Sequence, residues 1–399
     1  MQKLLYLVHR IPFPPNKGDK IRSFNFLKAL AERYDVYLGT FIDDSLDKQY
    51  VDDLKKYCKD VLCLDLNPKW SKVNSLRGFV TGEALSLPYY RDPQMQHWID
   101  RTIAEQGIDR VMTFSSPMAQ YLDKHTGLRL VADFVDVDSD KWRQYADSKS
   151  WPASWVYRRE ADKLLSFEKR VASRADKTLF VSEREAQLFK NLVLEATNKI
   201  DYVNNGVDAD AFDPAIAYLS PYTDGIKVIA FTGAMDYWAN VDAVKWFAEQ
   251  VFPLVKQRVP EALFYIVGSK PSKTVQELGE IDDAVIVTGK VDDVRAYVAH
   301  AHVVVAPLRI ARGIQNKVLE AMAMARPTVV TSAAMEGIPG KEGLHVQIAD
   351  LPEEFARFVI GILQQPFTCS PENRNYVLAD FGWQKNGERL CQFIAGEAG

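Results

Sequence analysis

RIARGIQNKVLEAMA, at residues 309–323, joins two apolar runs of strand length. The run before it is HVVVAP at 302–307, and the run after it is PTVVT at 327–331, whose proline stops the intervening helix. A strand, a glycine-containing loop, a helix and a second strand in this order indicate an α/β unit with a parallel sheet. Lys317 and Glu320 therefore lie on one face of the helix, in its first turns.

The start of this helix is suited to binding a phosphate group. At the carboxyl edge of a parallel sheet, the first N–H groups of a helix lack helical partners and the helix dipole is positive. Lys317 adds a cation there, and the Glu320 carboxylate can accept hydrogen bonds from the two hydroxyls of a ribose. An ordinary amphipathic helix with a surface lysine and glutamate has the same pattern, so both interpretations stay open.

The composition is that of a folded protein with two domains. The chain has 399 residues, 47% of them apolar and 26% charged, which is too long for one core of ordinary size. The formal net charge of -4 argues against binding nucleic acid by phosphate neutralisation, so no nucleic-acid partner is expected. The apolar run at 3–9 is too short for a signal peptide or a membrane span, and the cysteines lack metal-ligand spacing. We therefore expect a cytoplasmic protein with reduced thiols.

Apolar runs of strand length alternate with longer amphipathic stretches, a pattern typical of parallel strands joined by helices. In the first half we expect strands at residues 3–9, 36–41, 61–64, 110–114, 129–134, 178–181 and 200–203. In the second half we expect them at residues 228–232, 263–267, 284–288, 303–306 and 328–331. The sequence thus predicts an α/β fold of two doubly wound sheets that face a ligand cleft, joined by the turn-rich segment 204–225.

Short motifs through the chain resemble a known family. They are NGVD at 205–208, FDP at 212–214, FTG at 231–233, IVG at 266–268, VTGKV at 287–291 and KVLEAMA at 317–323. Together they resemble glycosyltransferase family 4, whose members are retaining nucleotide-sugar transferases with two Rossmann-like domains, the GT-B fold. HRIPFPPNKGDKIR at 9–22 and DFVDVDSDKW at 133–142 are similar to the sugar transferases of bacterial exopolysaccharide and PEP-CTERM gene clusters.

The resemblance implies a division of labour along the chain. Residues 1–205 are expected to form an acceptor-side domain, and residues 206–375 a nucleotide-sugar-binding domain. Residues 376–399 are expected to form a helix that returns to the first domain. FGW at 381–383 matches the segment that crosses back in GT-B enzymes, where a hinge would let the cleft close on the donor.

The resemblance also assigns roles around the helix that begins at 316. Glu320 matches the second glutamate of the family signature, which holds the ribose, whereas the first glutamate is replaced by Arg312. That guanidinium could contact the diphosphate, reach a carboxylate on the donor sugar or acceptor, or pair with a neighbouring acidic side chain. The stretch 233–240 lacks the Arg and Lys that relatives often carry, so Lys317, Arg309 and Arg312 are expected to stabilise the leaving diphosphate.

Further donor contacts follow from the same resemblance. Val291 matches the place where relatives pack the base, and an ordinary exposed loop is the alternative there. Gly18 lies in a loop that relatives place against the donor phosphates. The other residues expected to line the donor are Gly233, Gly313, Ile314, Gln315 and Asn316.

The acceptor side is expected to be acidic. The run Asp133, Asp136, Asp138 and Asp140 follows a strand end and would face the cleft, where Asp136 could orient the acceptor or take its proton. A turn cap or a salt bridge is the alternative for Asp136. Asp19 could bind an acceptor hydroxyl or cap a helix. Asp136 to Asp138 also imitates an Asp-x-Asp metal motif, but the two-sheet organisation argues against a metal, and none is expected.

Aromatic and basic residues alternate between Trp142 and Arg170. They could rest on anionic lipid at the inner face of the cytoplasmic membrane, which would suit a polyprenol-linked acceptor, or the tryptophans could pack in the core. We expect a metal-independent, retaining glycosyltransferase that needs no cofactor beyond its nucleotide-sugar donor and acts on a glycan or lipid-linked acceptor in exopolysaccharide synthesis. The alternatives are a non-hydrolysing nucleotide-sugar epimerase and a non-catalytic nucleotide- or sugar-binding module.

Overall fold

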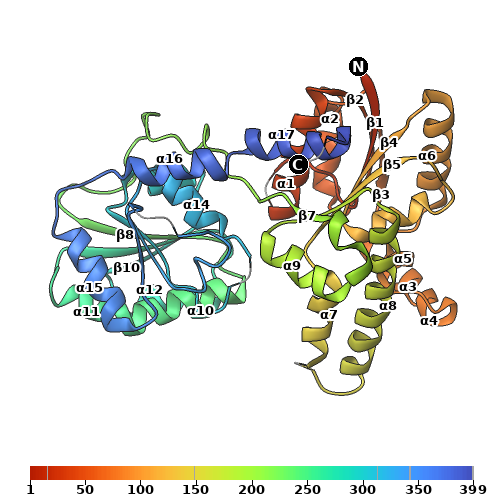
Figure 1. The fold of residues 1–399 in the computed structure, drawn as a ribbon. Coiled ribbons are helices and arrows are strands. Elements are labelled where there is room, and N and C mark those ends of the chain that lie inside the picture. Colours follow the sequence, from red (N-terminus) through yellow and green to blue (C-terminus); the bar gives the residue numbers. More distant parts are fainter. Residues whose placement is uncertain (16, 148, 312, 341–342, 398–399) are drawn as a thin grey trace. The chain divides into compact units, whose positions relative to one another are not determined.

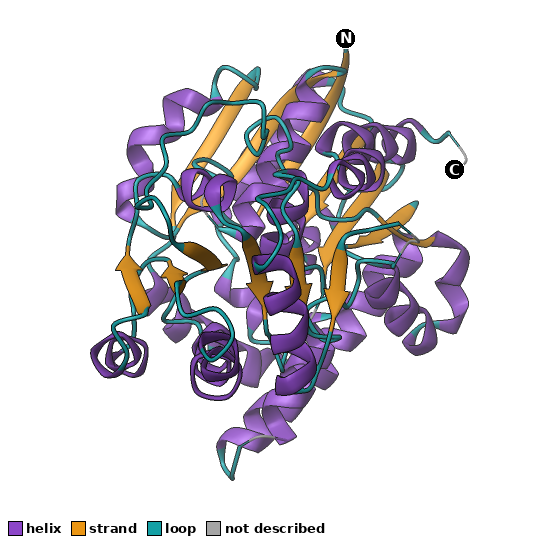
Figure 2. Ribbon diagram, turned by 90° about the vertical axis from the view of Figure 1, so that its left-hand side faces the viewer, coloured by secondary structure: helices purple, strands orange, loops and turns teal. Residues whose placement is uncertain are grey.

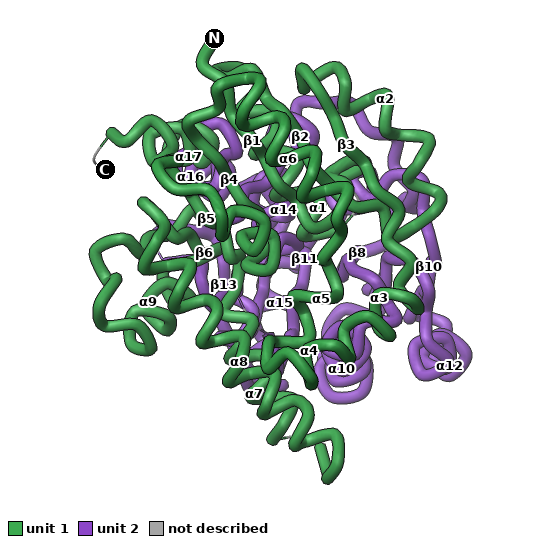
Figure 3. The backbone as a smooth tube through the Cα atoms, turned by 90° about the vertical axis from the view of Figure 1, so that its right-hand side faces the viewer, with its two compact units in different colours: residues 1–204, 386–399 green, residues 205–385 purple. Residues whose placement is uncertain are grey.

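The computed structural model describes the chain except for residues 16, 148, 312, 341–342 and 398–399 (Figure 1). Each half of the chain forms a parallel β-sheet covered by helices (Figure 2). The described residues divide into two compact units, coloured separately in Figure 3. The first unit comprises Met1–Asn204 together with Asn386–Gly399, and the second comprises Asn205–Lys385.

The sheet of the first unit has the strand order β3-β2-β1-β4-β5-β6-β7, with parallel neighbours throughout. Its strands are β1 (Gln2–Val8), β2 (Tyr34–Ile42), β3 (Asp60–Asp65), β4 (Arg110–Phe114), β5 (Arg129–Val135), β6 (Lys177–Phe180) and β7 (Ile200–Tyr202). β1 is central because its side chains from Leu4 to Val8 are apolar on both faces, and all of them are fully buried.

Helices cover both faces of this sheet. They are α1 (Gly18–Ala31), η1 (Ser45–Tyr50), α2 (Val51–Leu54), α3 (Pro68–Ser75), α4 (Arg77–Thr81), α5 (Ser86–Tyr89), α6 (Pro93–Gln106), η2 (Ser116–Leu122), α7 (Asp138–Asp147), α8 (Ala153–Arg174), α9 (Glu183–Leu192), η3 (Leu194–Lys199) and α17 (Trp383–Ala395). α17 packs closely on α1, because a Cβ at Gly387 would lie 2.5 Å from that of Ala29. On the other face, Leu5 and Leu7 of β1 share a core with α6 and α8.

The sheet of the second unit has the strand order β10-β9-β8-β11-β12-β13, also with parallel neighbours. Its strands are β8 (Lys227–Thr232), β9 (Ala262–Val267), β10 (Val285–Gly289), β11 (Val303–Ala306), β12 (Thr328–Val330) and β13 (Val346–Ile348). Its helices are α10 (Trp238–Trp246), η4 (Phe247–Val251), α11 (Phe252–Lys256), α12 (Lys273–Ile281), α13 (Val294–His300), α14 (Asn316–Ala323), α15 (Pro352–Leu363) and α16 (Pro371–Asp380). Among the described residues, none of the helices in either unit is both long and apolar enough for a membrane span.

Strand β8 shows how the second unit is layered. Ile229 and Phe231 point into one core and Val228 and Ala230 into another, because successive strand residues face opposite sides of a sheet. In Figure 1, α14 and α16 cover one face, and α10, α11 and α15 cover the other. The strand order reverses between β8 and β11, which is the switch point where ligands bind in doubly wound sheets.

The predicted α/β fold with two doubly wound sheets is confirmed, and each expected strand is present within a few residues. The edge strand β13 was not expected from the sequence. The expected domain boundary at 376 moves to Lys385, because α16 is tied to the second unit through Arg374, which donates to the carbonyls of Phe212 and Ala323 at 2.8 Å. The segment after Asn205 also belongs to the second unit and is no free linker, since the Tyr222 hydroxyl donates to the Tyr297 carbonyl.

Candidate functional site

The start of α14 lies just past the strand ends at the switch point of the second sheet. The chain leaves β11 at Ala306, passes through the loop with Gly313 in a left-handed conformation (φ 62°), and enters α14 at Asn316. The Gln315 amide donates back to the Gly313 carbonyl at 3.2 Å. The first N–H groups of a helix point away from its body, so this turn offers donors and a positive dipole end to an anion.

Lys317 provides the cation of this site. Its Nζ donates to Asn240 Oδ1 at 2.6 Å and lies 4.1 Å from the centre of the Phe231 ring. Within the described residues, no carboxylate forms a salt bridge with it. Because burial disfavours the charged ammonium, the pKa of Lys317 falls to about 7, although the nearby Glu320 opposes the shift. The ammonium is thus held by a neutral amide and an aromatic face, and an anionic ligand would supply the missing counter-charge.

Glu320 lies one turn further along α14. Burial raises its pKa to about 7, and the charge of Lys317 works against that rise. Two titratable groups of opposite charge, each shifted toward its neutral form, mark a place where a ligand can restore both charges. A phosphate would do so for Lys317, and hydroxyl donors would do so for Glu320.

The backbone beside Lys317 requires glycine at two positions. A Cβ on Gly268 would lie 1.6 Å from the carbonyl oxygen of Gly233, and no side chain fits at that distance. A Cβ on Gly233 would lie 2.7 Å from Asn240 Nδ2 and 3.0 Å from Lys317 Nζ. The loop after β8 is therefore packed against the end of β9, and its backbone reaches the lysine.

The structure treats the other two expected cations differently. Arg309 is half exposed and forms a two-point ion pair with Asp242 of α10, with its Nε 3.0 Å from Oδ2. It would have to leave Asp242 to reach a ligand. Arg312 lies outside the described residues.

The remaining donor-side residues are also placed. Ile314 is buried in the core of the second unit and touches the position where a Cβ on Gly337 would stand, at 3.2 Å, so its side chain serves packing. Val291 is half-buried in the loop after β10, next to Gly289 with φ 69°. Gly18 is exposed, and a Cβ there would have no other atom within 4 Å.

In the first unit, Asp19 belongs to a charged cluster after β1. It does not serve as the N-cap of α1, a position held by Lys17. Arg10 donates to Asp19 Oδ2 at 2.5 Å, and His9 Nε2 lies 3.5 Å from the same oxygen. Burial acts to raise the pKa of Asp19, but the hydrogen bond with His9 and the charge of Arg10 bring it well below its usual range. Asp19 is therefore ionised, with its charge already shared by two basic groups.

The acidic run divides into buried and accessible members. Asp136 and Asp138 both bind Lys141 Nζ, at 2.6 and 3.3 Å, and are about one-third exposed. The sequence suggested that Asp133 faces a ligand site, and this prediction is wrong. Asp133 is fully buried in β5 and pairs with Arg22 of α1, whose Nε lies 2.8 Å from Oδ2. Its place inside the strand, before the sheet edge, explains the difference.

Several residues around Lys317 in the second unit, and around Asp19 and Asp136 in the first, were assigned no role in the sequence analysis. In the second unit they are Asn240, Phe231 and Asp242; in the first they are His9, Arg10, Lys141 and the buried Glu168, whose pKa burial raises to about 8. The partners of Asn240 and Asp242 lie 77 and 67 residues away, so no local spacing indicates these contacts, whereas Lys141 lies only five residues from Asp136 and its spacing could have indicated the pair. Among the described residues there is no group of three or more His, Cys, Asp and Glu side chains arranged to hold a metal ion.

Known proteins share this architecture. Residues 226–365 match the family model of the glycosyl transferases group 1, a segment that contains the Lys317 site. A comparison with curated proteins gives no match. The matched segment covers most of the second unit and less than half of the whole chain.

Solved structures match over nearly the whole chain. HepE from Anabaena, in complex with UDP and glucose, has a TM-score of 0.65 at 13% identity and covers 99% of this chain and 100% of its own. Sucrose-phosphate synthase from Thermosynechococcus elongatus has a TM-score of 0.66 at 15% identity, covering 99% of both chains. A glycosyltransferase from Rickettsia africae has a TM-score of 0.64 at 13% identity, covering 99% of this chain and 98% of its own. The chain has the two-domain, Rossmann-like GT-B fold.

Proposed function

We propose that this protein is a retaining glycosyltransferase that moves a sugar from a nucleotide-sugar donor to a glycan or lipid-linked acceptor. The observation that carries the proposal is the Lys317 and Glu320 pair on α14. Both groups are pushed toward their neutral forms by burial, and they lie at the switch point of the second sheet. A nucleotide sugar offers both missing partners, a diphosphate for the cation and a ribose for the carboxylate.

The proposed reaction uses the diphosphate as leaving group. The bond between the anomeric carbon and the diphosphate oxygen breaks, and a bond from the acceptor oxygen to the same face of that carbon forms. The acceptor proton passes to the departing phosphate oxygen, so no protein nucleophile is needed. Lys317 and the first N–H groups of α14 stabilise the negative charge that develops on the diphosphate. Because the helix N–H groups are already oriented and the bound diphosphate restores the charge of Lys317, we propose that turnover needs no divalent metal.

We propose that the acceptor binds to the first unit and that the protein acts in bacterial exopolysaccharide synthesis. Support comes from the resemblance of residues 9–22 and 133–142 to sugar transferases of such gene clusters. Asp136 and Asp138 are accessible and lie beside Lys141, so they can bind acceptor hydroxyls without leaving an unpaired charge.

The first test is a thermal-shift screen with UDP-, GDP-, ADP- and dTDP-sugars, followed by a transfer assay with the donor that stabilises the protein. We expect one nucleotide class to raise the melting temperature, and slow release of nucleoside diphosphate without acceptor. NMR of the product should show the anomeric configuration of the donor, and EDTA should leave the rate unchanged. Interconversion of the sugar nucleotide would identify an epimerase instead. Binding without any turnover, across acceptor glycans and polyprenol-linked sugars, would identify a non-catalytic module.

A further inference from the structure

The segment of residues 66–82 in the first unit presents apolar side chains to solvent. Trp70 is 72% exposed and Val80 is 91% exposed, on α3 and α4. Val73, Leu76 and Phe79 on the same segment are also exposed. We call these five side chains the α3–α4 surface. Large apolar groups gathered at helical spacing on a surface mark a contact site more often than solitary exposed residues do.

The charges of this segment have one sign. Residues 66–82 contain Lys69, Lys72 and Arg77 and no aspartate or glutamate, in a chain whose formal net charge is -4. All three cations are exposed, and none forms a salt bridge within the described part of the chain. Tryptophan, phenylalanine and leucine combined with lysine and arginine are the composition of helices that lie in a membrane interface.

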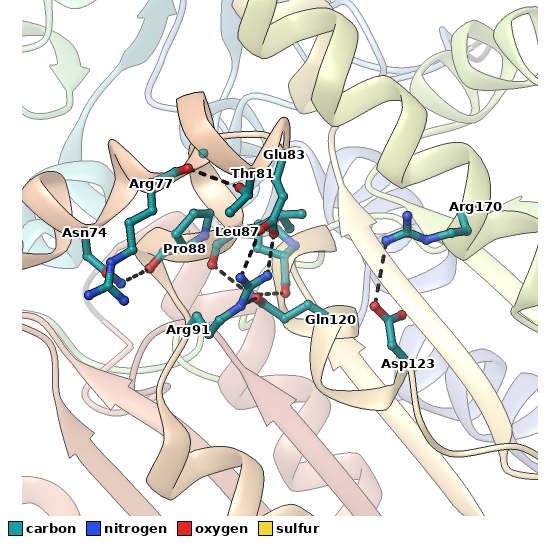
Figure 4. A network of polar contacts seen from close by, with 12 residues as sticks. Asn74, Arg77, Thr81, Glu83, Leu87, Pro88, Arg91, Gln120, Asp123 and Arg170 are labelled. Carbon is teal, nitrogen blue, oxygen red and sulfur yellow. Dashed lines mark hydrogen bonds and ion pairs between the residues drawn. The ribbon is translucent and has the colours of Figure 1, made fainter.

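Some small and polar residues of the same segment make its packing contacts, and Figure 4 shows Asn74 among them. Asn74 donates to the Pro88 carbonyl at 2.6 Å, and Ser71 and Gly78 are buried. A Cβ on Gly78 would lie 3.1 Å from the Glu83 carbonyl oxygen, so α4 packs through its glycine. A surface helix usually buries its apolar side chains, whereas this segment packs through small and polar residues and leaves five large apolar side chains exposed beside its cations.

Neighbouring elements hold the segment of residues 66–82 in place. Glu83 forms a two-point ion pair with Arg91, whose Nε donates to Gln120 Oε1 at 3.0 Å (Figure 4). From α8, Arg159 donates to the Gly78 and Glu83 carbonyls. The outward orientation of the apolar side chains is therefore fixed by the fold.

Helix α8 extends the surface. Trp155 is 55% exposed and its ring stacks on Phe79, with centroids 6.0 Å apart and planes inclined by 8°. The Arg159 guanidinium lies 4.8 Å from the centre of the same Phe79 ring. By contrast, Trp142 packs on Tyr157 against the core of the unit, so the basic and aromatic stretch 142–170 contributes only partly to the surface.

From these observations we propose that the α3–α4 surface docks the protein on an anionic lipid bilayer. Trp70, Leu76 and Val80 enter the boundary between headgroups and acyl chains, while Lys69, Lys72 and Arg77 contact the lipid phosphates. The absence of acidic residues over 66–82 favours a negatively charged partner. The inference deepens the proposed function, since it rests on an acceptor that is linked to lipid.

The test is co-sedimentation of the full chain with vesicles of phosphatidylcholine plus phosphatidylglycerol, and with vesicles of phosphatidylcholine alone. We expect binding to the anionic vesicles that weakens at high salt, because the charge contribution is screened. Val80→Asp should reduce the partition coefficient about tenfold or more, since a valine that is buried in the bilayer on binding is replaced by a charged side chain. Lys72→Glu should reduce it roughly 30-fold, because two unit charges are changed.

Matched controls are available in the second unit. Leu219 is as exposed as Val80, at 91%, and Lys273 is 90% exposed, so Leu219→Asp and Lys273→Glu should leave vesicle binding unchanged. Equal loss in these controls, or no binding of the wild type to anionic vesicles, overturns the proposal. Self-association of the wild type that Val80→Asp abolishes, without vesicle binding, also overturns it and assigns the surface to a second copy of the chain.

Vesicle binding and chemistry can fail separately. Val80→Asp should keep the slow release of nucleoside diphosphate from the donor, because the variant leaves the α14 site intact. Lys317→Ala should lose that release and still bind anionic vesicles. Vesicle binding without any turnover of the wild type would therefore contradict the proposed function and leave the lipid surface standing.

Discussion

The two units each contain a desolvated pair of opposite charges, but the two pairs are built differently. In the first unit, Arg22 and Asp133 are both fully buried, and the guanidinium also donates to the Val203 carbonyl at 2.7 Å. In the second unit, Lys317 and Glu320 are only half-buried, and they do not form a salt bridge with each other within the described residues. The first pair satisfies its charges within the protein, whereas the second leaves them for something else to satisfy.

This contrast separates a structural charge pair from a functional one. Desolvating an ion pair is tolerated when geometry and extra hydrogen bonds compensate it, as they do for Arg22. Lys317 has only the Asn240 amide and the Phe231 ring, and its pKa is lowered. A group kept partly unsatisfied costs stability, and such a cost is typical of binding sites.

The largest effect on stability is expected from Asp133→Ala. The substitution leaves the Arg22 charge buried without its counter-ion, which costs about 3–5 kcal/mol of the free energy of unfolding. Urea denaturation of the variant measures the loss. The double variant Arg22→Met with Asp133→Leu should recover most of it, because no buried charge remains. A loss below about 1 kcal/mol for Asp133→Ala would show that the two pairs are not distinct in the way described.

A comparable effect, on catalysis alone, is expected from Lys317→Ala. Removing the cation that stabilises the leaving diphosphate should lower kcat about 10²–10³-fold, which corresponds to roughly 3–4 kcal/mol. The free energy of unfolding should stay the same or rise, since a partly desolvated charge is removed. Steady-state kinetics and urea denaturation check the two expectations, with the exposed Lys273→Ala as control. A fully active variant would remove Lys317 from the mechanism.

The fold was predictable to a greater extent than either charge pair. Runs such as 303–306 and 228–232 are apolar on both faces, which is a local signal for buried parallel strands. β13 was missed because Val346–Ile348 is short and mostly exposed, so its pattern is weak. The boundary at Lys385 depends on the hydrogen bonds of Arg374, which connect residues far apart in sequence.

The site was predictable only in its local part. Lys317 and Glu320 follow from a strand, loop and helix in one short stretch. Asn240, the partner of Lys317, is 77 residues away, and the sequence near it shows no cation or motif that points to this contact. Asp133 was misplaced for a related reason, because a strand end located to within two residues does not decide whether a carboxylate is inside the sheet or beyond it.

A smaller effect, the change of nucleotide-sugar affinity with pH, tests whether the charges of Lys317 and Glu320 are unsatisfied in the free protein. The pKa of Lys317 is lowered to about 7, and a bound diphosphate restores the charged form, so affinity is complete below that pH and declines above it. The dissociation constant of a nucleotide sugar should rise by up to about tenfold per pH unit above about 7, until the pH reaches the pKa of the complex. Ionisation of Glu320, whose pKa burial raises to about 7, acts in the opposite direction and offsets part of this loss, because the ribose hydroxyls bind its carboxylate form.

Isothermal titration calorimetry in buffers of different ionisation enthalpy measures both the affinity and the proton uptake. The diphosphate of an intact nucleotide sugar keeps a constant charge in this range, so the slope reports on the protein. Lys317→Arg is the control, because a guanidinium stays charged and should remove the loss of affinity that the lysine causes above about pH 7. A wild type whose affinity changes with pH as that of the control does would mean that the lysine is already charged in the free protein.

The smallest effect is expected at Arg309, the exposed member of an ion pair with Asp242. Exposed pairs contribute little, so Arg309→Ala should change the free energy of unfolding by less than about 1 kcal/mol. Its kcat should fall less than about tenfold, since the guanidinium reaches a diphosphate only after leaving Asp242.

Asp242→Ala tests whether Arg309 contacts the donor or serves only the ion pair. If Arg309 contacts the donor, freeing it should tighten nucleotide-sugar binding in the calorimeter, and if it serves only the pair, both variants should bind as the wild type does. A loss at Arg309 as large as that at Lys317 would show that an already paired surface charge can serve the reaction as well as an unsatisfied one.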